Sequence, residues 1–149
     1  MTPPPLRPEA VQRRLREMRE LLGVLRRHAD VTGDELRTDL ERRLVVERAL
    51  QQLVDLAVKI NAHVATAAGL PAPASYYTSF LAAAEAGALD EDLAEALAPS
   101  TGLRNRLVHE YEEIDLTVVA SALPGAVDGY SDYVRHVAGW LQEQVDPES

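Results

Sequence analysis

The chain has 149 residues, of which 46% are hydrophobic and none is cysteine. This length and apolar content predict a single folded domain over residues 1–149, with flexible ends at 1–7 and 146–149, and exclude a disordered chain. Without cysteine there are no disulfides or thiolate metal sites, which fits a reducing cytoplasm. No signal peptide or long apolar run is visible, so we expect a cytoplasmic protein without a membrane span.

The net charge of −9 argues against a general nucleic-acid binder, because non-specific affinity depends on cations that neutralise phosphates. The charge is also uneven: residues 1–60 have a balance of +2 and residues 61–149 a balance of −11. Two of the few basic residues in the second part, Arg104 and Arg106, lie within one short motif. Any RNA would therefore have to bind in a local cleft, helped by the first helix.

The first half of the chain predicts two amphipathic helices. Apolar residues recur at spacings of three and four from about Pro8 to Ala29, and again from about Asp34 to Ala67. The Thr32-Gly33-Asp34 turn separates the two helices. The first helix has an Arg-rich outer face, which is either a solvated surface or an RNA track. This face contains Arg13, Arg14, Arg16, Arg19, Arg26 and Arg27.

The second half predicts shorter helices and one long apolar stripe. Ser75 is a good N-cap for a short helix, in which Tyr76, Tyr77 and Phe80 are interpreted as packing residues without basic neighbours. Pro124-Gly125 interrupts the last stripe, which is either two helices or one kinked helix. The predicted ranges are Ser75–Glu85, Asp90–Leu97, Ser100–Glu113 and Asp115–Leu141. Periodicity alone therefore predicts an all-α, up-and-down bundle of about five helices.

The predicted helix that starts near Ser100 combines polar groups suited to catalysis. At about 100° per residue, and with Arg104 at zero, Tyr111 falls about 20° away, Asn105 about 100° and His109 about 140°. An arginine grips phosphate through parallel hydrogen bonds, and a histidine titrates near neutrality. Asn105 and His109 are four residues apart, so the amide could orient the imidazole. The set is either a phosphate clamp with an acid/base group or a buried polar network.

Two carboxylates near the apolar stripe of the long predicted helix also have two interpretations. Glu47 and Asp55 either lie at a solvated edge or form a salt bridge to a nearby arginine, or they support the motif helix across the core or the dimer interface.

The string from Arg104 to Tyr111, followed by Ile114-Asp115, resembles the R-x4-6-H signature of HEPN ribonucleases, in the R-x4-H-x-Y form of the HepT toxins. The resemblance extends over most of the chain from about Leu36 onward. Lys59 and His63 depart from the polar pattern expected of the second helix, so no role is carried over to them.

The resemblance implies a HEPN-like, two-fold dimer whose motif helices share one cleft. It also implies a metal-independent endoribonuclease without a cofactor, the toxin of a toxin–antitoxin pair. His109 would move a proton at the ribose 2′-OH or at the 5′-leaving oxygen, and Arg104 would stabilise charge on the phosphate. Asn105 would support them. The products would be a 2′,3′-cyclic phosphate and a 5′-hydroxyl.

The resemblance also implies a partner. HepT toxins are paired with MntA-like nucleotidyltransferase antitoxins that transfer AMP to the motif tyrosine, which is Tyr111 here. Alternatively, Tyr111 packs at the dimer interface. Another interpretation of the whole chain is a non-catalytic HEPN-like partner or substrate-binding module for a nucleotidyltransferase, and a weaker one is a plain dimeric scaffold.

Overall fold

The computed structural model describes residues 2–110 and 112–146, and this part of the chain is helical without any strand. It contains seven helices, of which five have ten or more residues. The predicted all-α bundle is therefore confirmed. The helices are α1 (Pro8–Arg26), α2 (Gly33–Thr38), α3 (Leu40–Ala67), α4 (Tyr76–Glu85), α5 (Glu91–Leu97), α6 (Ser100–His109) and α7 (Leu116–Val145).

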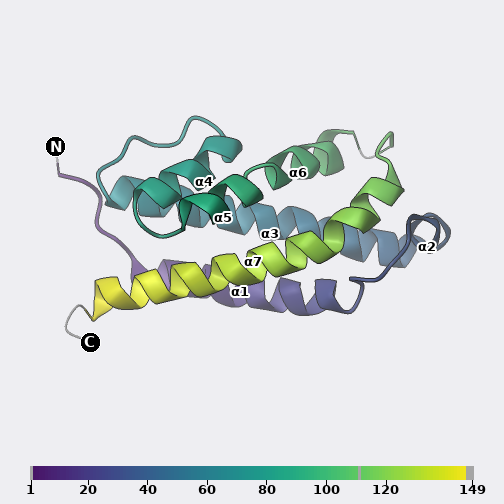
Figure 1. Cartoon of the computed structure of the whole chain (residues 1–149), viewed down its shortest axis with the longest axis horizontal. Helices are drawn as coiled ribbons and strands as arrows, with labels where there is room; N and C mark the ends of the chain where they lie inside the picture. The colour runs from purple at the N-terminus through teal and green to yellow at the C-terminus, as the bar shows by residue number, and fades with distance from the viewer. Residues whose placement is uncertain (1, 111, 147–149) are drawn as a thin grey trace.

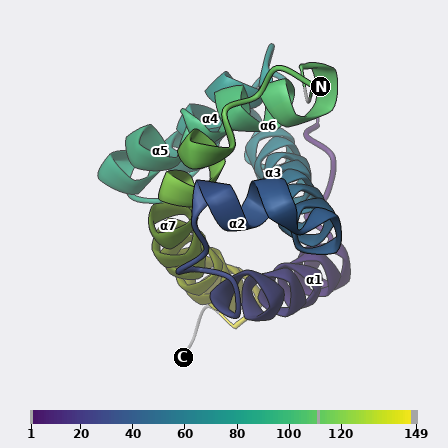
Figure 2. The same cartoon turned by 90° about the vertical axis from the view of Figure 1, so that its right-hand side faces the viewer.

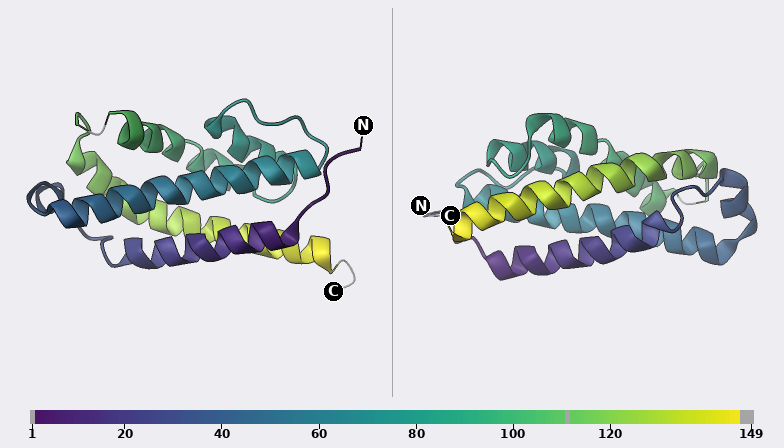
Figure 3. Two further views of the ribbon diagram at one scale, coloured as in Figure 1. Left: turned by 180° about the vertical axis from the view of Figure 1, so that it is seen from behind. Right: turned by 60° about the horizontal axis from the view of Figure 1, so that its bottom comes forward.

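Three long helices form the frame of the bundle. In Figure 1, α1, α3 and α7 lie along the long axis, and α1 runs in the opposite direction to α3 and α7. The view along that axis shows these three helices around the core, with α2 across one end and α4, α5 and α6 on one side (Figure 2). The two views of Figure 3 show the N-terminal segment and the end of α7 at the same end of the bundle. No helix among the described residues is long and apolar enough to cross a membrane.

The continuous helix predicted from Asp34 to Ala67 is wrong, because the chain breaks at Asp39. This residue has φ −122° and ψ 94°, which is extended backbone, and its side chain accepts the Arg42 backbone N–H at 3.1 Å. Asp39 therefore ends α2 and caps α3. An aspartate that satisfies a free N–H at a helix start competes well with a continued helix.

The last apolar stripe forms one helix, α7, which continues through Pro124. A proline removes one backbone hydrogen bond from a helix interior. Buried residues on both sides of Pro124, including Leu123 and Val127, hold the helix against the core. Packing against the core thus favours one helix over the alternative of two separate helices.

A buried polar network joins α3, α4 and α7. The Tyr133 hydroxyl donates to Asn61 Oδ1 at 2.7 Å, and Asn61 Nδ2 donates to Ser79 Oγ at 3.2 Å. Phe80 packs edge-on against Tyr133, with ring centroids 6.1 Å apart. These contacts fix the angle between α3 and α4, the two helices on which the motif helix rests.

Removing the Tyr133 hydroxyl is expected to destabilise the fold. Tyr133→Phe leaves the fully buried Asn61 oxygen without its donor, which costs about 1–3 kcal/mol of the free energy of unfolding. Urea denaturation followed by circular dichroism measures this loss. Tyr77→Phe is the matched control, because Tyr77 is 47% exposed and should unfold like the wild type. Equal midpoints for both variants would contradict a structural role of the network.

Candidate active site on helix α6

The motif helix α6 contacts both α3 and α4, and in Figure 1 it lies over α3, to the right of α4. Its first turn is fixed by two hydroxyls: Ser100 donates to the Leu97 carbonyl at 2.7 Å, and Thr101 donates to the Ala98 carbonyl at 2.8 Å. Leu107 is buried against the core. Because one face is anchored in this way, the other presents exposed Asn105 and His109 to solvent.

The motif helix was predicted to continue to Glu113, and this is wrong. α6 ends at His109, and Glu110 has non-helical angles of φ −131° and ψ 28°. The Glu113 N–H donates to the Glu110 carbonyl in a turn, and Asp115 then caps α7. The angle of about 20° from Arg104 that was predicted for Tyr111 assumed a continuous helix, so it no longer applies. Tyr111, the predicted AMP acceptor, lies outside the described residues.

Arg104 is held by a carboxylate from the central helix. Its Nε donates to Asp55 Oδ1 at 2.7 Å and its Nη2 donates to Asp55 Oδ2 at 3.4 Å. The Arg104 side chain is 15% exposed and that of Asp55 is 25% exposed. A parallel two-bond pair orients a guanidinium as well as attracting it. Asp55 thus forms a salt bridge to an arginine, and because that arginine belongs to α6, the salt bridge also supports the motif helix.

One face of the Arg104 guanidinium covers an aromatic ring. Its Cζ lies 4.9 Å from the centroid of Tyr76, the first residue of α4, within the range of a cation–π contact. The prediction that the tyrosines of α4 have no basic neighbour is therefore wrong for Tyr76. Phe80 is buried as predicted, whereas Tyr77 is exposed.

Asn105 contacts Arg104, the residue before it in the sequence. Its Oδ1 accepts from Arg104 Nη1 at 3.4 Å, and no hydrogen bond joins Asn105 to His109 among the described residues. A charged donor is the stronger attraction for an amide oxygen, which accounts for this choice. The imidazole of His109 is exposed at the last position of α6.

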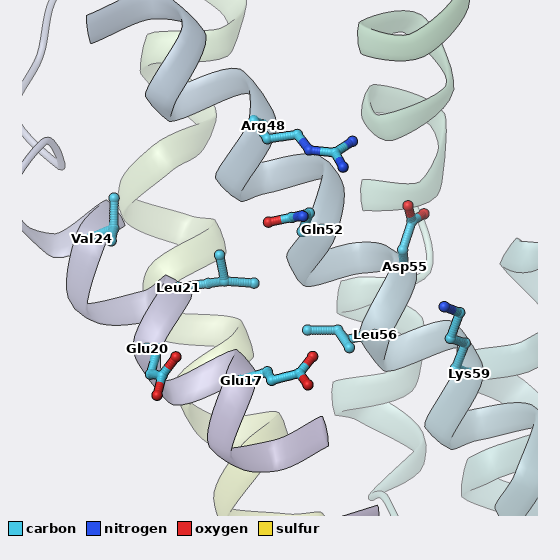
Figure 4. Close-up of a pocket in the computed structure, with 9 residues that line it drawn as sticks. All are labelled: Glu17, Glu20, Leu21, Val24, Arg48, Gln52, Asp55, Leu56 and Lys59. Carbon is cyan, nitrogen blue, oxygen red and sulfur yellow. The ribbon is translucent and has the colours of Figure 1, made fainter. Parts of the chain in front are cut away.

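A groove of about 490 Å³ runs beside this cluster, between α1 and α3. In Figure 4, Asp55 points away from α1 on the α3 wall, with Arg48 and Lys59 on either side along the helix. Glu17 and Glu20 line the α1 wall. Two arginines of the predicted Arg-rich face, Arg16 and Arg19, line a separate groove toward α7.

Two other polar residues singled out in the sequence, Glu47 and His63, have structural partners. Glu47 accepts from Arg43 Nε at 2.6 Å within α3. His63 Nε2 accepts the Arg7 backbone N–H at 3.0 Å and so ties the N-terminal segment to α3. Burial, together with the charges of Arg7 and Arg14, lowers the pKa of His63. Within residues 2–110 and 112–146, no three His, Cys, Asp or Glu side chains gather as a metal site.

Comparison with known proteins identifies the family. The family model described as ribonuclease HepT-like matches residues 11–137. The chain belongs to the ribonuclease HepT-like family. The predicted enzyme class, an endoribonuclease, is thereby confirmed.

Two curated HepT relatives are similar over most of the HepT-like chain. The tRNA nuclease HepT of Aphanizomenon flos-aquae is 36% identical over 139 residues, which cover 91% of this chain and 92% of the relative. The mRNA nuclease HepT of Shewanella oneidensis is 25% identical over 102 residues, covering 68% and 77% of the two chains.

Solved structures show the same fold for this HepT-like chain. A tri-AMPylated HEPN toxin of Shewanella oneidensis, in complex with an MNT antitoxin, has a TM-score of 0.77 at 19% identity. The comparison covers 87% of this chain and 97% of that one. A toxin–antitoxin structure with AMP-PNP has a TM-score of 0.78 at 18% identity, with coverage of 88% and 98%. At these identities the likeness concerns the fold, and the predicted HEPN-like bundle is confirmed.

Sequence reasoning missed one part of this HepT-like site. It interpreted Tyr76 only as a packing residue, because the arginine that covers its ring is 28 positions away in sequence. Nothing in the sequence around an aromatic residue at a helix start indicates that a distant arginine will pack on its ring. The sequence did indicate a role for Asp55, because a carboxylate close to the apolar stripe of a helix needs a partner when it is buried.

Proposed function

We propose that this HepT-like ribonuclease cleaves RNA without a metal ion, with Arg104 and His109 as its catalytic residues. The observation that carries the proposal is the arrangement on α6. Arg104 is oriented by Asp55 and Tyr76, and an exposed imidazole follows five residues later on the same short helix. A fixed guanidinium suits a phosphate, and a solvent-facing histidine suits proton transfer.

The proposed reaction uses the substrate's own 2′-hydroxyl. His109 removes the proton from this hydroxyl, the oxygen attacks the adjacent phosphorus, and the bond to the 5′-oxygen breaks. A protonated imidazole then supplies the proton for that leaving oxygen. Arg104 stabilises the negative charge that grows on the non-bridging oxygens. The products are a 2′,3′-cyclic phosphate and a 5′-hydroxyl, and DNA is not cut because it lacks the nucleophile.

We further propose that the active form is a two-fold homodimer, since one chain offers one His109 and the reaction uses both a base and an acid. An exposed apolar surface next to α6 supports this proposal. Leu40 is 64% exposed, Leu44 57% and Val45 43%. Leu40 and Leu44 border a groove of about 310 Å³ that also reaches Leu107 of the motif helix. A second copy on this surface would bring the two motif helices together.

The biological role we propose is a cytoplasmic toxin neutralised by an MntA-like nucleotidyltransferase antitoxin. The fold similarity to an AMPylated HEPN toxin in complex with an MNT antitoxin supports this assignment. In the neutralising reaction the Tyr111 hydroxyl attacks the α-phosphorus of ATP, a phosphodiester forms, and pyrophosphate leaves. Tyr111 lies two residues after His109 in the sequence, so the added AMP would attach a bulky, negatively charged group next to a proposed catalytic residue.

Replacing either catalytic side chain is expected to abolish cleavage. Arg104→Ala and His109→Ala should each slow cleavage of single-stranded RNA by about 100-fold or more, the usual contribution of a positioned acid or base. Gel analysis with EDTA present also tests the metal-free mechanism. Arg106→Ala is the matched control, because it removes an exposed arginine from the same helix. Intact RNA with the wild-type chain would instead favour a non-catalytic binding module.

Modification by the antitoxin is expected at a single residue. Incubation with an MntA-like nucleotidyltransferase, ATP and Mg²⁺ should add AMP to Tyr111 and stop RNA cleavage. Tyr111→Phe should remain unmodified and active, whereas Tyr77→Phe, at another exposed tyrosine, should be modified like the wild type. Peptide mass spectrometry locates the adduct. AMP found on any other residue would contradict the assignment.

A charge on the exposed apolar surface is expected to separate the dimer. Leu44→Glu places a carboxylate where the second copy would pack, so the variant should sediment as a monomer and lose RNA cleavage. Val145→Glu is the control, because Val145 is similarly exposed, at 53%, but lies at the end of α7. Analytical ultracentrifugation gives the mass. A wild-type monomer, or a Leu44→Glu dimer, would remove this surface from the interface.

A further inference from the structure

Arg104 is held on one edge and one face. Its side edge, formed by Nε and Nη2, is occupied by the two oxygens of Asp55 at 2.7 and 3.4 Å. One face lies over the Tyr76 ring, with 4.9 Å between Cζ and the ring centroid. The two partners come from α3 and α4, so three helices determine the direction of one guanidinium.

The end edge of the same guanidinium is far less engaged. This edge, formed by Nη1 and the second N–H of Nη2, has one contact, from Nη1 to Asn105 Oδ1 at 3.4 Å. That distance is long for a hydrogen bond from a charged donor. Arginine binds phosphate best through two parallel N–H groups, and the end edge provides such a pair.

The anchor of this arrangement is rigid. Asp55 lies in the middle of α3, between turns whose residues Leu53, Val54 and Ala57 are buried in the core. Its carboxylate faces away from α1 and borders the groove along α3 (Figure 4). Because its backbone is held in this way, the Asp55 carboxylate limits where the paired guanidinium can lie.

We propose that Asp55 and Tyr76 are positioning residues, which turn the end edge of Arg104 toward the scissile phosphate. The proposal rests on the proposed function and adds residues to it. Asp55 also offsets the positive charge of Arg104 and so weakens its attraction for RNA. Removing the carboxylate should therefore impair catalysis more than binding. A purely structural carboxylate would show no such division between kcat and KM.

Asp55→Asn is the informative variant. Its amide keeps one oxygen for Nε but presents an N–H group to Nη2, so the side-edge pair is lost. We expect kcat per folded molecule to fall at least tenfold, while KM stays the same or decreases. Circular dichroism gives the folded fraction. Tyr76→Leu should act in the same direction, and Tyr76→Phe, which keeps the ring, should behave like the wild type.

A phosphorothioate substrate separates positioning from stability. With sulfur in place of one non-bridging oxygen at the scissile phosphate, the wild type should distinguish the two stereoisomers, because the N–H groups of a guanidinium held in one direction meet the two non-bridging oxygens unequally. In Asp55→Asn the ratio of the two rates should move toward one. Asp132→Asn is the charge-matched control, since it removes the carboxylate partner of Arg135 on α7. It should keep the wild-type kcat and ratio.

Two results would overturn the proposal: an Asp55→Asn variant with the wild-type kcat, or a slower variant with the wild-type stereoisomer ratio. If the wild type cleaves no RNA, the proposed function fails, and NMR of the Arg104 side chain then decides the positioning separately. The guanidinium N–H signals of Arg104 should be distinct in the wild type, where the pair with Asp55 restricts rotation, and averaged in Asp55→Asn. Signals that are equally distinct, or equally averaged, in the two proteins would reject the role of Asp55.

Discussion

The ion pair between Arg104 and Asp55 links the short motif helix to the centre of the bundle. α6 has only ten residues, and an isolated helix of this length is marginal in water. Its position depends on Leu107 in the core and on the guanidinium that reaches α3. Both partners are largely withdrawn from solvent, so the pair resists salt better than a surface pair. The candidate site is thus an extension of the packing between α3, α4 and α6.

The end of α6 determines what the site presents to solvent. The helix ends at His109, and a turn of a few residues leads to Asp115, which caps α7. The candidate acid/base group, His109, therefore lies at the last position of α6, next to the segment that joins α6 to α7. Functional groups often occupy such positions, because a connection can change conformation while the helix before it stays fixed. Arg104, more than one turn earlier, lies on the fixed part.

The electrostatics of the chain favour local over general binding of RNA. Several arginines are already paired with carboxylates, so they contribute little to long-range attraction of phosphates. The groove beside Asp55 has Arg48 and Lys59 on one wall and Glu17 and Glu20 on the other. Such a mixed groove does not attract nucleic acid in general. In the proposed function, recognition of RNA then depends on the fit at the motif and on surfaces that a second copy would add.

The sequence by itself determined the helical class, most helix starts and the position of the motif. These follow from local causes: the spacing of apolar residues, a serine or aspartate at a helix start, and a motif contained within eight consecutive residues. Tertiary structure decided the break at Asp39, the continuation of α7 through Pro124, and the end of α6 at His109. It also brought Asp55 and Tyr76 to Arg104 from 49 and 28 positions away. Contacts between distant segments depend on how helices pack, and periodicity along one helix does not contain that information.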